Sequence, residues 1–571
     1  MNVPPPEHLR IWQQNVNRSL IAQLHVLNTA RPSDWDIILL QEPWIGSINT
    51  RTTPFWTPLY PDIFLNNRST TPRSLILVNN NIPSDSYTHL LLPSLDASGI
   101  QIKVLDQTLI IINIYNACDH NDTLHAVSAF LSPMFPDDHV PENTHVILGG
   151  DFNRHHPLWE EPRNSHLKSS ELLLLPLMNI IRQLDLRMAL PPCIPTLEAL
   201  STRNWTRPDN VWCSSHSTDL FIRCTTDPGL RAPNTDHLPI VYTLDIPVPR
   251  SAKTQTRNFQ ATNWAEFTST LSAILDDSPK PRRIRSHQEF RSAISMLNAA
   301  IASSIAEHVP LSTPAPFTKR WWTPQLSALR KKKNRLSNLS YRWRGLPDHY
   351  AHADHKATVK EYAKLIESTK KQHWESWLEN ASDRDLWTAN KYASNPPSDG
   401  GKTRIPDLVF KEADGSSRHT NSNDEKSIAL AESFFPPPPL HPSIPHSAYP
   451  EPADFFSYFT RDHIKWVTRK LPAYKAPGPD GVPNVVLKES ISVIINHLFF
   501  IFKAIFQLKV YPDEWRESIT VVLRKPGKPA YDLPKAYRPI ALLNSMGKLF
   551  STLMADCQGH SAPLTNPCWS T

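Results

Sequence analysis

Two polar residues, Asp151 and Asn153, follow directly after the apolar run Val146–Leu148 and two glycines. Because alternate residues of a strand point to the same side, both side chains should leave the strand end in one direction. A carboxylate can orient a water or bind a metal ion, and an amide can donate hydrogen bonds to a phosphate that gains charge. Asp-X-Asn also occurs in ordinary turns. The segment therefore indicates phosphodiester chemistry only if similar residues accompany it.

Other polar residues stand at the ends of predicted strands or in the loops after them, where open α/β sheets place their sites. Carboxylate and amide oxygens are ligands that Mg²⁺ prefers. A histidine oriented by a carboxylate suits acid–base work near neutral pH. The candidate set, in chain order, is Asn15, Glu42, Tyr115, Asp151, Asn153, Asp209, Asp236 and His237.

The elements that must position these residues are short apolar runs separated by Pro, Asn, Asp and Ser. Helical stretches intervene at Leu124–Leu131 and Glu171–Leu186. Residues 1–249 are therefore predicted to form an α/β sandwich, with sheets in the middle and helices outside. The expected strands are Leu9–Val16, Asp36–Gln41, Ser74–Val78, Ile100–Leu105, Leu109–Tyr115, His145–Leu148, Asp219–Cys224 and Pro239–Leu244.

The pattern changes after this domain. Residues 250–394 predict a mostly α, basic segment with helices over Trp264–Leu275, Gln288–Glu307, Thr323–Trp343 and His355–Trp387. Residues 395–452 are rich in Pro and Gly and predict a flexible or polyproline linker. A third unit, residues 453–571, begins after it.

Composition limits the class of protein. A chain of 571 residues predicts two to four units. It has 55 Pro and only 14 Gly, so long stretches are loop or linker. The six cysteines lack CxxC spacing, which argues against a zinc site or a disulfide framework. No signal-peptide core opens the chain, and the apolar stretch Val493–Leu508 is interrupted by polar residues, which favours a buried helix over a membrane span. An intracellular protein is expected.

The net charge of +6 is small, but nine basic residues and no acidic one lie between Lys319 and Arg344. This helix could be a solvated face with aromatic anchors, or it could bind nucleic acid through Arg330, Lys331, Lys332 and Lys333. We favour nucleic-acid contact.

At this point the chain resembles a known family. The first ~245 residues look like the endonuclease/exonuclease/phosphatase superfamily, which has a DNase I-like, four-layered α/β sandwich fold. The resemblance is sharper to the endonucleases of non-LTR (LINE-like) retrotransposons, through Gln41–Trp44 and Gly150–Trp159. The other matching pieces are Gln14-Asn15, Asn113-Ile114-Tyr115, Arg207-Pro208-Asp209 and Thr235-Asp236-His237.

The resemblance implies a role for each candidate. Glu42 would be the main Mg²⁺ ligand, helped by Asn15 and Asp236, with Mn²⁺ as a substitute ion. Asp151 would position or deprotonate the attacking water. Asn153 and Tyr115 would hold the scissile phosphate, and His237 would act on the phosphate or on the water. Asp209 would orient His237, although Asp219 competes for that role, and Thr196 would contact a DNA phosphate.

The third unit resembles the opening of a retroelement reverse transcriptase. The matching segments are Leu471–Pro483, Trp515, Val521–Lys528 and Tyr537–Leu543, an α+β fingers region in which Lys525 and Arg538 would lie near template and nucleotide. The paired Asp residues that polymerases need do not follow. A truncated reverse transcriptase without polymerase activity is therefore expected.

The leading hypothesis is a Mg²⁺-dependent DNA endonuclease that nicks double-stranded DNA and leaves a 3′-hydroxyl for target-primed reverse transcription. A nuclear location is expected. Element RNA is a second expected partner, held by the basic helix. Two alternatives stay open: an abasic-site nuclease or other phosphoesterase of the same fold, and an inactive remnant that only binds nucleic acid.

Overall fold

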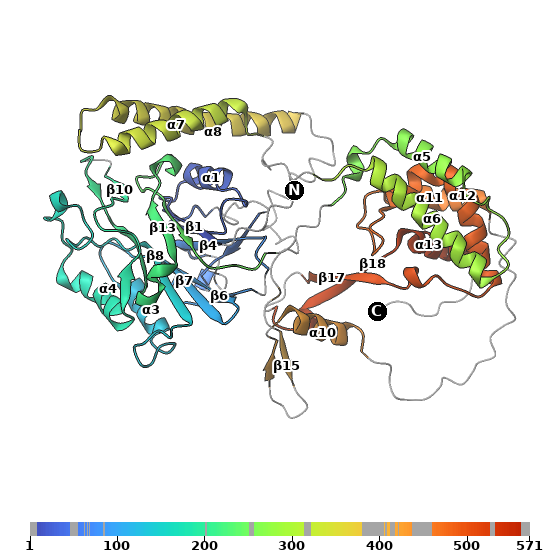
Figure 1. Cartoon of the computed structure of the whole chain (residues 1–571), viewed down its shortest axis with the longest axis horizontal. Coiled ribbons are helices and arrows are strands. Elements are labelled where there is room, and N and C mark those ends of the chain that lie inside the picture. The colour runs from blue at the N-terminus through green and yellow to red at the C-terminus, as the bar shows by residue number, and fades with distance from the viewer. Residues whose placement is uncertain are drawn as a thin grey trace. The chain divides into compact units, whose positions relative to one another are not determined.

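The computed structural model describes residues 8–45, 55–61, 63–64, 67, 69–83, 86–199, 202–250, 256–312, 321–379, 405, 408–411, 417–420, 422–436, 460–525 and 531–560. The chain forms two compact units (Figure 1). Unit 1 contains residues 1–253 and 315–404, and unit 2 contains residues 254–314 and 405–571.

Two six-stranded mixed sheets form the centre of unit 1. The first has the order β13-β14-β1-β2-β4-β3, and these strands span Phe221–Thr226, Ile240–Leu244, Leu9–Asn15, Ile37–Gln41, Ser74–Asn79 and Trp56–Leu59. The second has the order β5-β6-β7-β8-β12-β9, spanning Tyr87–Leu90, Ala97–Val104, Gln107–Tyr115, Thr144–Asp151, Asp209–Ser214 and Leu186–Met188. A short hairpin, β10 (Leu197–Glu198) with β11 (Trp205–Thr206), lies outside both sheets.

The two sheets share one apolar core, in which Ile11 and Leu39 of the first sheet join Ile111 and Val211 of the second. Because the strands are covered on both faces, they are almost continuously apolar rather than alternating. Helix α1 (Leu20–Thr29) covers the outer face of the first sheet, and helices α3 (Asp122–Leu131) and α4 (Glu171–Gln183) cover that of the second (Figure 1). The predicted α/β sandwich with sheets inside and helices outside is therefore confirmed. Three 3₁₀ turns complete the domain: η1 (Pro162–Asn164), η2 (Ser215–Leu220) and η3 (Pro228–Leu230).

The helices expected over residues 250–394 do not stay together. Helices α7 (Pro324–Arg342) and α8 (Tyr350–Glu379) form a hairpin that belongs to unit 1, next to α1 (Figure 1). Helices α5 (Trp264–Asp276) and α6 (His287–His308), with η4 (Phe259–Ala261), belong to unit 2. Helical periodicity predicts that each helix has a buried face, but it does not identify the surface that covers this face. The sequence therefore could not show that two of these helices pack in unit 1 and two in unit 2.

Unit 2 is built around α12 (Asn484–Gln507), which packs against α5, α6, α11 (Arg461–Lys470) and α13 (Ser545–His560). An antiparallel pair, β17 (Ser518–Arg524) and β18 (Tyr537–Leu543), accompanies these helices, with η6 (Asp513–Trp515) and η7 (Pro534–Ala536). By length and composition α12 could cross a membrane, but 61% of its apolar stretch is buried inside the protein. This burial agrees with the core helix predicted from the sequence.

The predicted Pro-rich linker, residues 395–452, lies largely outside the described residues. Its described part forms β15 (Val409–Lys411), β16 (Ser417–His419) and helix α10 (Asn423–Phe434). Leu408, Ala429 and Leu430 of this part pack with Ala536 and Tyr537 of unit 2.

Candidate active site

Three candidate residues lie side by side because of strand register in the second sheet. Strands β7 and β8 are parallel and pair Tyr115 with Asp151. Strand β12 runs antiparallel to β8 and pairs Asp209 with the same Asp151. The ends of β7 and β8 and the start of β12 therefore meet at one edge, as expected for a site on such a sheet.

His237 completes this group from a loop of the first sheet. Its Nδ1 lies 2.9 and 3.1 Å from the two carboxylate oxygens of Asp209, to which it donates. Its Nε2 lies 3.8 Å from an oxygen of Asp151 and 3.8 Å from an oxygen of Asp236. Asp209 therefore fixes the ring so that Nε2 is directed at the other carboxylates.

Burial and mutual charge shift the pKa values of this group. Burial raises the pKa of Asp151, and the neighbouring carboxylate of Asp209 raises it further, against His237 and hydrogen bonds that lower it. Burial alone would lower the pKa of His237, but Asp209 and Asp151 more than offset this, so its pKa is raised. At neutral pH the group therefore combines a protonated imidazole with a carboxylate that accepts a proton more readily than usual.

Two asparagines hold the carboxylate of Asp151. The amide of Asn15, at the end of β1, donates to Asp151 Oδ2 at 2.9 Å. The backbone N–H of Asn153 donates to Asp151 Oδ1 at 3.1 Å, and its side-chain amide donates to the carbonyl of Asn116 at 2.8 Å. Asn153 has a φ of 49°, a left-handed conformation that Asn tolerates better than most residues. This tight turn presents both Asp151 and Asn153 at the strand end.

Glu42 follows β2 with a φ of 46°, and its side chain is only 16% exposed, with Arg18 Nε at 3.3 Å. Burial raises the pKa of the Tyr115 hydroxyl, and the charges of Glu42 and Asp151 raise it further. The guanidinium of Arg73 lies 4.6 Å above the Tyr115 ring. Tyr115 therefore remains a neutral hydrogen-bond donor between two acidic residues.

The group could hold a metal ion. Asp151, Asp209 and His237 offer ligand atoms within 4.8 Å of one another. However, Asp209 already accepts from Nδ1 of His237, so the carboxylates of Glu42 and Asp236, which are 16% and 22% exposed, are the freer oxygen ligands nearby. The donor set of carboxylate and amide oxygens fits a hard divalent cation.

Two predicted nucleic-acid contacts lie elsewhere than expected. The side chain of Thr196 is buried and donates to Asp209 at 2.6 Å, so it supports that carboxylate instead of facing DNA. The side chain of Lys333 is fully buried and donates to the carbonyls of Gly229 and Arg231. Both expectations are corrected, because neither spacing nor residue type reveals which face of an element is covered.

The other predicted contacts are accessible to different degrees. Lys331 and Lys332 are exposed on α7, and Arg330 lies over the Trp322 ring at 5.6 Å. In unit 2, Lys525 follows β17 and donates to the carbonyl of Lys535 at 3.1 Å, and Arg538 is exposed on β18.

Sequence reasoning gave no role to two buried arginines that hold the site loops. Arg154 donates to the carbonyls of Ala117, Asn153 and His120 and to the side chain of Asn121. Arg207 donates to Asn210 and to the carbonyls of Leu190 and Pro191. One sequence feature could have indicated this role: Arg154 follows Asn153, and Arg207 precedes Asp209 by two residues, so both lie in segments that carry candidate site residues.

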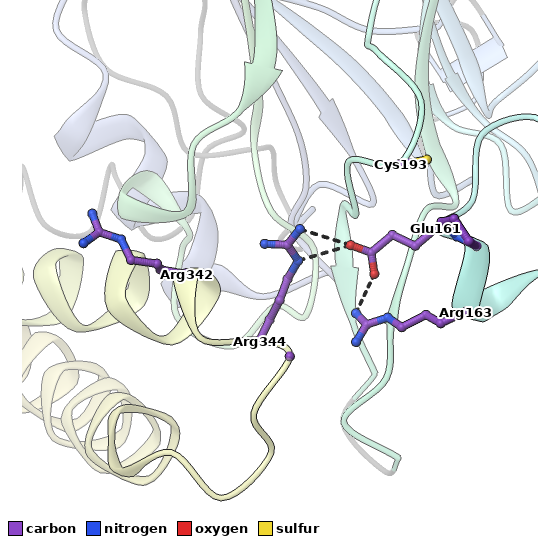
Figure 2. A pocket seen from close by; sticks show the side chains of 7 residues that line it. Glu161, Arg163, Cys193, Arg342 and Arg344 are labelled. Carbon is purple, nitrogen blue, oxygen red and sulfur yellow. Dashed lines mark hydrogen bonds and ion pairs between the residues drawn. The ribbon is translucent and has the colours of Figure 1, made fainter.

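An open cavity of about 460 Å³ lies away from these residues, where the end of α7 meets η1. Figure 2 shows the Glu161 carboxylate between the guanidinium groups of Arg163 and Arg344. None of the residues that line it belongs to the candidate site.

Residues 109–241, which include Tyr115, Asp151, Asp209 and His237, match the family model described as endonuclease-reverse transcriptase. Unit 1 therefore contains the residues of this chain that match the endonuclease-reverse transcriptase family. The matched residues run from β7 to the start of β14, and they include four of the six strands of the second sheet and the catalytic candidates.

Curated relatives are retrotransposon polyproteins. A probable RNA-directed DNA polymerase from transposon BS of Drosophila melanogaster is 37% identical over 95 residues, 17% of this chain and 10% of the relative. The corresponding protein of transposon X-element of the same species is 27% identical over 353 residues, 56% of this chain and 36% of the relative. A Pol polyprotein from element R1 of Bradysia coprophila is 23% identical over 320 residues, 54% of this chain and 30% of the relative. The chain thus spans between about a tenth and about a third of these relatives.

Solved structures with some likeness include the endonuclease domain of TRAS1, a telomere-specific non-LTR retrotransposon. It is 18% identical, with a TM-score of 0.33, covering 41% of this chain and 98% of that one. An AP endonuclease from Archaeoglobus fulgidus is 18% identical, with a TM-score of 0.32, covering 42% of this chain and 100% of that one.

Proposed function

We propose that unit 1 is a Mg²⁺-dependent DNA endonuclease that hydrolyses one phosphodiester of double-stranded DNA and leaves a 3′-hydroxyl for target-primed reverse transcription. The observation that carries the proposal is the buried arrangement of Asp151, His237 and Asp209 at one sheet edge. Perturbed, mutually interacting acid and base groups of this kind are typical of catalytic sites.

The chemistry of each residue follows from its surroundings. Asp151 is held by Asn15 and Asn153, and its raised pKa suits a group that orients a water and accepts its proton. The protonated imidazole of His237, oriented by Asp209, would stabilise the charge that builds up on the phosphate. Tyr115, kept neutral, would donate to a phosphate oxygen, and so would the amide of Asn153.

Glu42, Asn15 and Asp236 would hold the metal ion, with Mg²⁺ as the physiological ion and Mn²⁺ as a substitute. When bound, such an ion supplies positive charge to the phosphate and its leaving oxygen. Duplex DNA is the proposed substrate. The half-buried Arg330 and the exposed Lys331 and Lys332 on α7 are proposed to bind DNA or element RNA.

The segments that resemble a reverse transcriptase lie between α11 and α12, in η6, in and after β17, and in β18. We therefore propose that unit 2 is part of a reverse-transcriptase fingers region. We predict no primer extension by residues 1–571, because these residues contain no Tyr-X-Asp-Asp sequence. Nuclear localisation is proposed, since duplex DNA is the proposed substrate.

The test is nicking of supercoiled plasmid by the full-length chain, with Mg²⁺ or with EDTA, beside Asp151→Asn and His237→Ala. We expect Mg²⁺-dependent conversion to open circles that both variants lose. Parallel substrates carrying an abasic site, and phosphoinositides, separate the alternatives. Exclusive cleavage of abasic DNA would favour a repair-type nuclease, and no cleavage of any substrate by a folded protein would favour a binding remnant.

A further inference from the structure

The helical hairpin α7–α8 packs on the endonuclease domain along its length. Leu326 of α7 and Tyr362 and Ile366 of α8 form an apolar cluster with Ile21 of α1. The hydroxyl of Tyr362 lies 3.1 Å from Nδ1 of His25, which is also on α1. The hairpin therefore covers the outer face of α1 with apolar surface and one buried polar pair.

Helix α7 also contacts η3, the segment that precedes the loop with Asp236 and His237. The Ser337 hydroxyl donates to the carbonyl of Pro228 at 2.6 Å. Lys333, one turn before it on α7, donates its ammonium group to the carbonyls of Arg231 and, at 3.5 Å, Gly229. Two side chains of α7 thus bind three backbone carbonyls in and directly after η3.

The end of α7 is fixed as well. Tyr341 contacts the Trp205 ring edge-on, with ring centroids 5.3 Å apart, next to the β10–β11 hairpin. Arg344 donates to Glu161 at 3.1 and 3.2 Å, as Figure 2 shows. These contacts leave α7 little freedom to shift along the domain.

Arg231 continues the connection into the site. Its guanidinium donates to the carbonyls of Thr235 at 3.3 Å and Asp236 at 3.2 Å, and to the Glu198 carboxylate at 2.5 Å. The Thr235 hydroxyl donates to the carbonyl of Asn15 at 2.9 Å and accepts from the N–H of His237 at 3.2 Å. The backbone that presents Asp236 and His237 is therefore held from behind by Arg231.

We propose that Lys333 and Arg231 are positioning residues of the endonuclease, through which the α7–α8 hairpin holds the loop 231–237 in its active arrangement. The hairpin is then a constituent of the nuclease and not a linker. This inference rests on the proposed function only where it concerns the nicking rate.

The electrostatics of Lys333 support this role. Burial and the nearby charges of Arg231 and Arg330 lower the pKa of its ammonium group to about 7. Among the described residues no carboxylate pairs with it, and only backbone carbonyls accept its protons. A buried ammonium group is costly unless its hydrogen bonds are made, so two loop carbonyls and this lysine stabilise one another.

The test compares the full-length wild type with Lys333→Met, which keeps the length of the side chain but removes its donors. Lys360→Met, an exposed lysine of the same hairpin, is the matched control. Two quantities are measured: kcat and KM for plasmid nicking, and hydrogen–deuterium exchange of the backbone over residues 227–238. We expect Lys333→Met to lower kcat at least tenfold with KM within twofold of wild type, and to accelerate exchange in this segment. Lys360→Met should change neither.

Unchanged exchange, or faster exchange with an unchanged kcat, would overturn the proposal. If Lys333→Met does not fold, Ser337→Ala tests the proposal instead, since this substitution removes one hydroxyl and no charge. Wild-type exchange together with a wild-type kcat in Ser337→Ala would also overturn the proposal. If the wild type itself does not nick DNA, the proposed function fails, while the exchange measurement still decides whether α7 holds the loop.

Discussion

The carboxylate of Asp209 accepts a hydrogen bond from Nδ1 of His237 at 2.9 Å, although Asp209 begins β12 of the second sheet and His237 lies in the loop before β14 of the first. The same carboxylate accepts from Thr196 at 2.6 Å and is buried. Its position is therefore set before any ligand binds. The imidazole ring is held in one orientation, with Nε2 directed at Asp151 and Asp236.

Replacing Asp209 by Asn should slow nicking by about 10²-fold or more, because the amide keeps the shape but no longer stabilises a protonated His237. The initial rate of plasmid nicking at saturating DNA measures this. Asp219→Asn is the control, since Asp219 is exposed in η2 and should leave the rate unchanged. A folded Asp209→Asn protein with the wild-type rate would show that the pair has no catalytic role.

Much of this site could be anticipated because strand ends are visible in a sequence. The predicted strands Leu9–Val16 and Asp36–Gln41 agree with β1 and β2 to within one residue at each end, and His145–Leu148 forms the first part of the longer β8, which continues to Asp151. Continuous apolar character and the polar residue after it are both local features. The assignment of catalytic and metal roles stays a prediction from the resemblance.

What the sequence could not supply is pairing between distant segments. Nothing local shows that β12 runs antiparallel to β8 and so places Asp209 against Asp151. Helix α1 was missed because its residues 22–27 are all buried, including Gln23 and His25, so it has no polar face to mark a helical period. Lys333 was predicted to bind nucleic acid because the sequence does not show which segment buries it. That segment is η3, which lies about a hundred residues earlier in the chain.

Arg154 should prove essential for the stability of the loop beside Asn153. Its buried guanidinium donates to five carbonyls and one side-chain oxygen around residues 117–121, 153 and 173, and a shorter ammonium cannot serve these directions together. We expect Arg154→Lys to lower the free energy of unfolding by about 3 kcal/mol, within the range for unsatisfied buried groups. Urea denaturation tests this, and Arg182→Lys on the exposed face of α4 should have no effect. Equal midpoints for the two variants would contradict the expectation.

Gly150 should tolerate no side chain. A Cβ at this position would lie 1.9 Å from the carbonyl oxygen of Ile114, its backbone partner on β7. Since backbone atoms cannot move aside without breaking the parallel ladder, Gly150→Ala should destabilise the domain by at least about 3 kcal/mol. The yield of soluble protein and the thermal midpoint report this. Gly345→Ala, where nothing lies within 4 Å, is the matched control and should behave as wild type.

The buried ion pairs of Asp36 should make stability depend on pH. Burial alone would raise the pKa of Asp36, but hydrogen bonds from Arg250 and Arg10 lower it below its ordinary value. A lowered folded-state pKa means that the stabilisation is fully present above the unfolded pKa of about 3.9 and is lost as the pH falls through the folded value. Asp36→Asn should therefore reduce the free energy of unfolding at pH 7 by about 3 kcal/mol, and the difference from wild type should shrink on acidification below about pH 4. Urea midpoints across this range measure the effect, and Asp245→Asn, an exposed partner of His8, should show no such pH-dependent difference. A difference that persists unchanged at low pH would mean that the charge of Asp36 is not its source.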